Sequence, residues 1–377
     1  DGQLYVSGLV RNAKDAQRMY NYWPLALDTP VPTPHGWSTI GELRPGDEVF
    51  DECGAPVEVV DTTAVFLNED CYRVTFDDGS SIVASGNHQW RVERRGKRTS
   101  ATFEWSPLTV STRDLVPGDD FIRVTRPLQT SRSVPLDPYF VGVWLGDGDS
   151  SGPIITQNKA DADEMIDILV SRGLDAGNLR ASSTACRFSV YGVRSEMVAL
   201  NLLGNKHVPD CYLRASIEDR LELLRGLMDT DGSVGANGQC SISTTSPTLR
   251  DGICELLRSL GVKFGVVARD GRVINSPNGK TYHGADHWQI SFSCRDDLRV
   301  FNLTRKIART IDRLHHPRRT TRFGIATVER VASVPVKCIT VASDNHLFLA
   351  GEGMVPTHNC SQEAEMLALA PKAPFIG

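Results

Sequence analysis

The chain has 377 residues, enough for two or three domains, and its 40% hydrophobic content, 23% charged content and net charge of −5 are typical of a soluble globular protein. No apolar run approaches the roughly 20 residues that a membrane span requires, and the first residues lack the basic and apolar regions of a signal peptide, so neither membrane insertion nor export is expected. The nine cysteines are scattered without a Cys-x-x-Cys pair, which argues against a zinc site and favours free thiols in a reducing cytosol.

In chain order, the sequence predicts a helix near each end, two strand-rich stretches and a mixed stretch between them. Residues 13–20 suit a helix, with Asn12 as its cap. Residues 29–126 alternate apolar and polar positions between turns, including a hairpin turn at Asp78-Gly79. Residues 136–322 combine helix and strand patterns, residues 328–354 return to strands, and residues 362–369 are rich in helix formers. The pattern indicates a β-rich domain interrupted by an insert.

Residues 355–360 read Val-Pro-Thr-His-Asn-Cys, and the last three are the side chains that a chain needs in order to cut itself. The carboxamide nitrogen of Asn359 can attack its own backbone carbonyl, close a succinimide and break the bond to Cys360. His358 can polarise that carbonyl or carry the proton, and Cys360 can hold an acyl group as a thioester. A loop His-Asn-Cys is also ordinary by chance, so its interpretation depends on the rest of the chain.

Three upstream segments give the closing residues their context. Residues 29–49 run from Thr-Pro-Val-Pro to Gly-Asp-Glu-Val, residues 85–90 read Ser-Gly-Asn-His-Gln-Trp, and residues 336–341 read Val-Lys-Cys-Ile-Thr-Val, with His-Leu-Phe-Leu-Ala behind them. In this order, with the closing block, they resemble the inteins, the protein-splicing family, over residues 24–359. The resemblance implies self-catalysed splicing, without a cofactor, on an all-β Hint (horseshoe) domain that brings both chain ends together.

The chain departs from most inteins at their first residue. Inteins generally begin with Cys or Ser, but Pro24 stands at that position and has neither a nucleophile nor an N–H. Cys338 occupies a place where most inteins carry Asp, Trp90 follows His88 by two residues, and Thr357 precedes the closing Asn by two. This combination of Trp, Cys and Thr resembles the class 3 inteins, in which the internal cysteine makes the first attack.

The resemblance implies a stepwise mechanism. Cys338 attacks the Trp23 carbonyl and forms a branched thioester, while His88 protonates the departing Pro24 nitrogen. The acyl group passes to Cys360, Asn359 cyclises, and a thioester-to-amide shift joins Trp23 to Cys360. The tertiary amide at Pro24 has a smaller trans preference than other peptide bonds, which makes a twisted bond less costly there.

Each of these residues also has a purely structural interpretation. A lone strand cysteine such as Cys338 is usually core filler, Trp90 can be packing, and His88 can be a turn histidine. Residues 344–346, Asp-Asn-His, either orient the site or shape a turn. The order of the blocks, combined with the missing first nucleophile, favours splicing.

The insert contains two similar segments: residues 140–148 read Phe-Val-Gly-Val-Trp-Leu-Gly-Asp-Gly, and residues 224–232 read Leu-Arg-Gly-Leu-Met-Asp-Thr-Asp-Gly. They resemble the two LAGLIDADG motifs of homing endonucleases. The resemblance implies an α+β domain with two pseudo-symmetric halves, whose paired helices pack at Gly142 and Gly226 and project Asp147 and Asp231 into one site. Two adjacent carboxylates are costly unless a cation neutralises them, so Mg²⁺ and phosphodiester hydrolysis are implied.

The endonuclease prediction has its own alternatives. Asp-Gly after an apolar run is also a common end of a helix, and Leu145 stands where the first motif has an acidic residue in the family. Such inserts often decay to inactive forms. Lys206 resembles the basic residue that precedes the second motif and is expected to stabilise developing charge or order a water; a solvated loop lysine is the alternative.

Double-stranded DNA at the intein-free host allele is the partner that the endonuclease family implies. β-Ribbons within residues 184–194, 266–272 and 288–292 are candidates for the major groove. Basic side chains expected to contact phosphates are Arg305, Lys306, Arg309, Arg318, Arg319 and Arg322. A basic run is also often a solvated surface.

The predicted divisions are an N-extein at 1–23, Hint segments at 24–128 and 327–359, the endonuclease domain at 129–326, and a C-extein at 360–377. Joined, the flanks resemble a segment of tailed-phage portal proteins, which implies the cytoplasm of a bacterium that hosts a phage or prophage. A monomer with no membrane partner is expected. Two alternatives remain: a Hint domain that cleaves without ligating and carries a decayed insert, and an inert phage structural fragment.

Overall fold

The computed structural model describes residues 22–99, 102–181, 185–235, 238–271, 273–275, 281–293, 298–311 and 321–360. The chain divides into two compact units, one built from residues 1–125 and 322–377 and the other from residues 126–321. The terminal helices predicted at 13–20 and 362–369 lie outside the described residues.

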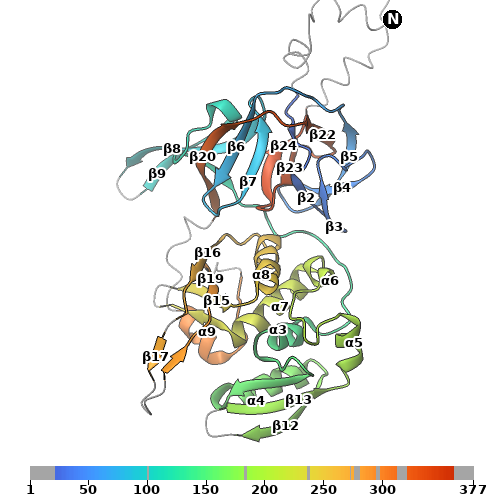
Figure 1. The fold of residues 1–377 in the computed structure, drawn as a ribbon, viewed down its shortest axis with the longest axis vertical. Helices are drawn as coiled ribbons and strands as arrows, with labels where there is room; N and C mark the ends of the chain where they lie inside the picture. Colours follow the sequence, from blue (N-terminus) through green and yellow to red (C-terminus); the bar gives the residue numbers. More distant parts are fainter. Residues whose placement is uncertain are drawn as a thin grey trace, which may run out of the picture. The chain divides into compact units, whose positions relative to one another are not determined.

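The first unit consists almost wholly of strands (Figure 1). Its elements are β1 (Leu25–Ala26), β2 (Pro30–Thr33), β3 (Gly36–Thr39), β4 (Glu48–Phe50), β5 (Pro56–Thr62), β6 (Cys71–Phe76), β7 (Ser81–Ser85), β8 (Gln89–Thr99), β9 (Thr102–Ser111), the 3₁₀ turn η1 (Thr112–Asp114), β10 (Asp120–Arg123), β20 (Arg322–Val331), β21 (Val336–Lys337), β22 (Ile339–Val341), β23 (Leu347–Ala350) and β24 (Val355–His358).

The main sheet of this unit has the strand order β21-β1-β7-β6-β20-β10-β8-β9, so segments from both ends of the chain are neighbours in it. The turn expected at Asp78-Gly79 joins β6 to β7: Gly79 has a φ of +87°, which glycine adopts readily, and Ser80 N–H donates to the Asp78 carboxylate at 2.9 Å. Buried apolar side chains from these strands, among them Val74 and Ala84, form the core.

Two strands mark where the insert leaves and rejoins this sheet. β10 and β20 pair antiparallel, with Arg123 opposite Arg322. The sheet therefore resumes at Arg322, and this residue belongs to β20 of the first unit rather than to the insert predicted to extend to residue 326.

The second unit mixes helices and strands. Its elements are α3 (Pro138–Asp147), β11 (Ile154–Asn158), α4 (Lys159–Ser171), β12 (Asp175–Ala181), β13 (Ala185–Tyr191), α5 (Arg194–Ala199), α6 (Asp210–Leu213), α7 (Ile217–Thr230), β14 (Gly232–Val234), β15 (Gln239–Thr244), α8 (Pro247–Ser259), β16 (Phe264–Arg269), β17 (Val273–Asn275), β18 (Thr281–His283), β19 (His287–Ser293) and α9 (Thr304–Ile311).

The second unit repeats one pattern twice. α3 is followed by a sheet of order β11-β13-β12 with α4 inserted, and α7 is followed by a sheet containing β15-β19-β16 with α8 inserted. The registers match as well: Ile155 pairs with Phe188 in one half and Ile242 with Ile290 in the other. The predicted fold class, a β-rich domain interrupted by an α+β domain with two pseudo-symmetric halves, is confirmed.

α3 and α7 pack against each other through their glycines. A Cβ added at Gly142 would overlap the Leu223 carbonyl oxygen, and one added at Gly226 would overlap the carbonyl oxygen of Tyr139. The helix backbones therefore touch directly, and Ser216 caps the start of α7 by accepting from Asp219 N–H at 3.1 Å. No helix in the described ranges is both long enough and apolar enough to cross a membrane.

Candidate functional site

The register of β1 brings the Trp23–Pro24 bond next to Cys338. Leu25 pairs with Lys337, and continuing this antiparallel register sets Pro24 opposite Cys338. On its other side β1 is fixed to β7, and the Pro24 carbonyl accepts from Ser85 N–H at 3.0 Å. Although β1 has only two residues, it is held from both sides.

The Cys338 sulfur lies against the residue whose carbonyl an attacking thiol must reach. Trp23 N–H donates to Cys338 Sγ over 3.1 Å, and the Trp23 carbonyl carbon is two bonds from that nitrogen. Cys338 is 2% exposed. Burial, together with the neighbouring Cys360 thiol, raises the pKa of Cys338 well above its ordinary value, while the Trp23 N–H acts in the opposite direction. The resting side chain is therefore a thiol.

The His88 imidazole connects both junctions. Its Nδ1 lies 2.6 Å from the Trp23 carbonyl oxygen, and its Nε2 is hydrogen-bonded to the Thr357 hydroxyl. Burial lowers the pKa of His88 to about 3, so the ring is neutral at physiological pH. A carbonyl oxygen only accepts, so Nδ1 must carry the proton and Nε2 must accept from Thr357. The donated proton thus points at the carbonyl oxygen, not at the Pro24 nitrogen that the sequence prediction named.

Trp90 packs its ring edge-on against the His88 ring, with centroids 4.9 Å apart, and is fully buried. Its indole N–H donates to Thr112 Oγ1 at 2.9 Å. The sequence reasoning did not single out Thr112, because a threonine after a strand carries no motif of its own.

The C-terminal junction is tied to the strand that follows Cys338. Cys360 N–H donates to the Ile339 carbonyl at 3.1 Å, and the Asn359 carboxamide nitrogen donates to the Val341 carbonyl at 3.2 Å. Asn359 Oδ1 is buried and has no hydrogen-bond partner among the described residues. The attacking nitrogen of Asn359 is thus held by another carbonyl and must turn before it can reach its own.

His358 and His346 flank this junction. Burial lowers the pKa of His358 to about 4, and neither of its ring nitrogens has a hydrogen-bond partner among the described residues. Its ring lies edge-on to Trp23 with centroids 5.5 Å apart. His346 has a φ of +57° and its carbonyl accepts from Asn359 N–H at 2.8 Å, while Asn345 Oδ1 accepts from Leu347 N–H at 3.1 Å. Asn345 therefore shapes a turn, and His346 holds the asparagine through its backbone.

The second unit brings the two motif carboxylates together at the ends of α3 and α7. Burial and, to a lesser extent, the negative charge of Asp231 raise the pKa of Asp147 to about 6. Burial also raises the pKa of Asp231. Gln157 Nε2 donates to Asp147 Oδ2 at 3.2 Å. Two carboxylates that resist ionisation in this way are suited to a cation.

Two lysines share this site, one in each half. Lys206 Nζ donates to the Gly146 carbonyl at 2.8 Å, and Lys306 Nζ donates to the carbonyls of Met228, Asp229 and Gly232 at 2.7–2.8 Å. Both ammonium groups act on the motif carboxylates by lowering their pKa. Burial lowers the pKa of Lys306 to about 8.

This geometry corrects the sequence prediction for Lys306. The side chain is 6% exposed and is occupied by backbone carbonyls, so it is removed from the phosphate-contact set. Arg305 is bound by the Asp161 carboxylate, and Arg322 lies in the first unit against Glu93 and the Trp105 ring. Arg309 is exposed. Arg318 and Arg319 lie outside the described residues.

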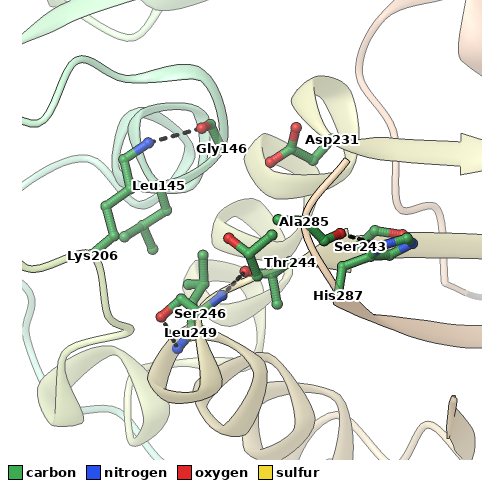
Figure 2. A pocket seen from close by; sticks show the side chains of 11 residues that line it. Leu145, Gly146, Lys206, Asp231, Ser243, Thr244, Ser246, Leu249, Ala285 and His287 are labelled. Carbon is green, nitrogen blue, oxygen red and sulfur yellow. Dashed lines mark hydrogen bonds between the residues drawn. The ribbon is translucent and has the colours of Figure 1, made fainter. Parts of the chain in front are cut away.

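A pocket of about 390 Å³ opens beside Asp231 and Lys206 (Figure 2). Ser243, Thr244 and His287, from the strands of the second half, line it as well. His287 had not been singled out in the sequence.

The three ribbons proposed for DNA overlap β13, β16 and β19. Buried and more exposed side chains alternate in β13 and β19, whereas residues 265–269 of β16 are all exposed. In β13, Phe188 and Val190 are buried, whereas Arg187 before them and Tyr191 after them are exposed. Residues 184 and 272 of the predicted ribbons lie outside the described part of the chain.

Residues 207–287 match a family model described as Homing endonuclease. This segment falls within the second unit and includes Asp231, which agrees with the prediction of an endonuclease insert. The model matches less than half of the chain, so it describes the insert alone.

A curated relative named Replicative DNA helicase DnaB, from Mycobacterium intracellulare, is 36% identical over 373 residues, and the match covers 91% of this chain. The chain spans only 59% of that relative's length. The helicase name gives no support to the predicted phage portal host, which is withdrawn. The portal prediction depended on short flanks that lie almost entirely outside the described residues.

Among solved structures, one titled "Crystal structure of MchDnaB-1 intein (N145AA)" is 18% identical, covers 89% of this chain and 99% of its own, and has a TM-score of 0.30. An I-DmoI variant whose title gives a complex with its target DNA in the presence of Mn is 14% identical, covers 42% of this chain and 87% of its own, and has a TM-score of 0.29. TM-scores of this size do not establish a shared fold, so the fold assignment depends on the strands and helices described above.

Proposed function

We propose that the first unit catalyses protein splicing by the class 3 route. The observation that carries this proposal is the position of Cys338 Sγ, 3.1 Å from the Trp23 nitrogen, while His88 Nδ1 lies 2.6 Å from the Trp23 carbonyl oxygen. A nucleophile and a hydrogen-bond donor thus flank one peptide carbonyl, the arrangement that acyl transfer needs.

In the proposed first step, Cys338 Sγ loses its proton and bonds to the Trp23 carbonyl carbon. The Nδ1–H of His88 stabilises the oxyanion. The carbon–nitrogen bond to Pro24 then breaks as the Nδ1 proton passes to the Pro24 nitrogen and the proton released by Cys338 replaces it on Nδ1. His88 therefore ends neutral, and Trp23 remains as a thioester on Cys338. Thr357 supports this step by donating to Nε2, which keeps the proton on Nδ1.

In the next step, Cys360 Sγ loses its proton and attacks the thioester, and Cys338 Sγ leaves and takes up that proton. The Cys360 thiol lies within hydrogen-bonding reach of Cys338, which favours transfer and ligation over simple cleavage. The Asn359 nitrogen then turns away from the Val341 carbonyl and attacks its own carbonyl carbon. The bond to Cys360 breaks, the freed Cys360 amine attacks the thioester, and an amide joins the flanks.

The decisive experiment expresses the whole chain and measures its products by mass spectrometry. Splicing predicts the joined flanks together with a species ending in a succinimide. A Cys338→Ala variant should accumulate precursor, with Cys211→Ala as the matched control, because Cys211 lies in the other unit. Flanks that appear only as separate peptides would favour the cleaving Hint domain, and joined flanks from Cys338→Ala would overturn the proposed route.

We propose in addition that the second unit cleaves double-stranded DNA. The homing-endonuclease match and the neighbouring carboxylates of Asp147 and Asp231, whose pKa values are both raised, support this activity. Both carboxylates offer oxygen ligands of the kind that Mg²⁺ prefers, and no third His, Cys, Asp or Glu joins them among the described residues, so water and phosphate oxygens would complete the shell. When bound, the metal would activate water and neutralise charge on the phosphate.

Cleavage of a DNA fragment that carries the intein-free host allele tests this second activity. Mg²⁺ should be required, and Asp231→Asn should remove cleavage while DNA binding remains. Asp163→Asn, an exposed change on α4, is the control. A chain that binds the fragment but never cuts it under any divalent metal would identify a decayed insert.

A further inference from the structure

The hydroxyl of Thr112 lies behind the splicing site and joins two of its parts. It accepts from the Trp90 indole N–H at 2.9 Å, and it is placed to donate to the carbonyl of Ser85 at 2.9 Å or of His88 at 3.2 Å. The backbone N–H of Thr112 also donates to the His88 carbonyl, at 2.8 Å. Thr112, which is fully buried, is thus within hydrogen-bonding distance of both ends of the turn 85–88 and of Trp90 after it.

The His88 imidazole depends on this arrangement for its orientation. Nδ1 and Nε2 lie in line with the Trp23 carbonyl and the Thr357 hydroxyl only while the ring keeps its tilt. The tilt is supported from one side by the edge of Trp90, 68° to the imidazole plane. The indole in turn has one polar atom, and that atom is held by Thr112.

We propose that Thr112 is a positioning residue for the first splicing step, acting through Trp90 and the His88 turn and touching neither junction. This inference rests on the proposed splicing function. An alanine or valine at this position would leave a buried indole N–H without its partner and would remove the hydrogen bond from the hydroxyl to the turn. Because the imidazole must meet the developing oxyanion within a few tenths of an ångström, a small tilt should slow the attack of Cys338.

The test measures the two junctions separately in the full chain. In an Asn359→Ala background, which cannot cyclise, release of the N-terminal flank by added thiol reports thioester formation on Cys338. In a Cys338→Ala background, release of the C-terminal flank reports cyclisation of Asn359. Thr112→Val should slow the first reaction about tenfold or more, as misplacement of a catalytic group does. It should change the second reaction by less than about twofold, because His88 Nδ1 serves the N-terminal carbonyl.

Three further variants separate positioning from general stability. Thr112→Ser keeps the hydroxyl and should restore most of the rate. Thr125→Val is the matched control, since Thr125 is another buried threonine of this unit whose hydroxyl donates to a backbone carbonyl, that of Glu52, at 3.1 Å. In a Trp90→Phe background, which has no indole N–H, the added effect of Thr112→Val should shrink to a few-fold.

If Thr112→Val slows the reactions at both junctions equally, Thr112 has only a structural role and the inference is overturned. The inference is also overturned if Thr112→Val slows the first reaction as strongly in the Trp90→Phe background as in the parent. If Thr112→Val does not fold, Thr112→Ala gives the same comparison, because the smaller side chain leaves space for a water at the indole N–H. Failure of thiol to release any flank from the Asn359→Ala parent would instead refute the splicing proposal itself.

Discussion

In the absence of divalent metal, we expect the charge of Asp147 to destabilise the insert. Its carboxylate lies at the C-terminal end of α3, where the helix dipole disfavours negative charge, and next to Asp231. Among the described residues, the Asp147 carboxylate accepts a hydrogen bond only from the neutral Gln157, at 3.2 Å. Asp147→Asn keeps the shape and removes the charge, so the variant should resist unfolding better than the parent in the absence of divalent metal.

The size of this effect on the free energy of unfolding follows from the pKa of Asp147. Burial and Asp231 raise the pKa of Asp147 from 3.8 to about 6, so the folded state holds its proton where the unfolded chain has lost it. Below pH 3.8 both states are protonated and the residue contributes nothing. As the pH rises past 6 the folded state must carry the charge, which costs roughly 3 kcal/mol near pH 8, about 1.5 near pH 5 and less than about 1 near pH 4.

Hydrogen–deuterium exchange of the α3 and α7 amides measures the stability of this unit directly. Asp147→Asn should slow exchange strongly at pH 8 and only slightly near pH 4. The control variant Asp163→Asn should leave the exchange rate unchanged at both pH values. Millimolar Mg²⁺ should stabilise the parent but not the variant, because the ion binds the charged form. An Asp147→Asn variant that exchanges faster than the parent at pH 8 without metal would refute the reasoning.

Three other predictions concern single features. Because burial raises the pKa of Cys338 well above its ordinary value, thiol-dependent release of the N-terminal flank should climb about tenfold per pH unit from pH 6 to 9; a plateau near neutrality would contradict this. Gly226→Ala drives a Cβ into the Tyr139 carbonyl and should cost about 3 kcal/mol or more of insert stability, measured by exchange of α7, with splicing unchanged. Lys306→Met should destabilise α9 by about 2–4 kcal/mol, because several buried carbonyls lose their hydrogen-bond donor. The exposed Arg309 differs: Arg309→Gln should only lower the salt dependence of DNA binding, measured by titrations at several ionic strengths.

The sequence was sufficient for the parts of the molecule where chemistry restricts residue type. The division into a strand-rich domain and a mixed insert follows from periodicity, and the two Asp-Gly motifs fall at the ends of two helices that touch. Because Pro24 carries no nucleophile, the sequence predicted a thiol from elsewhere in the chain, and the Cys338 sulfur lies 3.1 Å from the Trp23 nitrogen. In each case the local chemistry or packing restricts which residue types can occupy the position.

The sequence was insufficient where function depends on contacts between distant segments. Thr112 is one of many threonines after strands, and only the fold sets its hydroxyl under the Trp90 indole. Lys306 stands in a basic stretch that resembles a phosphate-binding surface, yet the turn of α9 directs it into carbonyl oxygens at the end of α7. Charge alone does not distinguish a lysine that faces water from one that caps a helix. A comparison of the two halves, each with a lysine near its motif, is the signal that would have revealed it.

The pairing of β1 with β21 carries a consequence for the order of events during synthesis. The bond between Trp23 and Pro24 leaves the ribosome before the sulfur beside it, because Cys338 is made more than 300 residues later. On the proposed route, a chain whose synthesis stops between these two positions keeps its leading segment attached. Synthesis of the chain through Cys338 would then be the condition for the first bond to break.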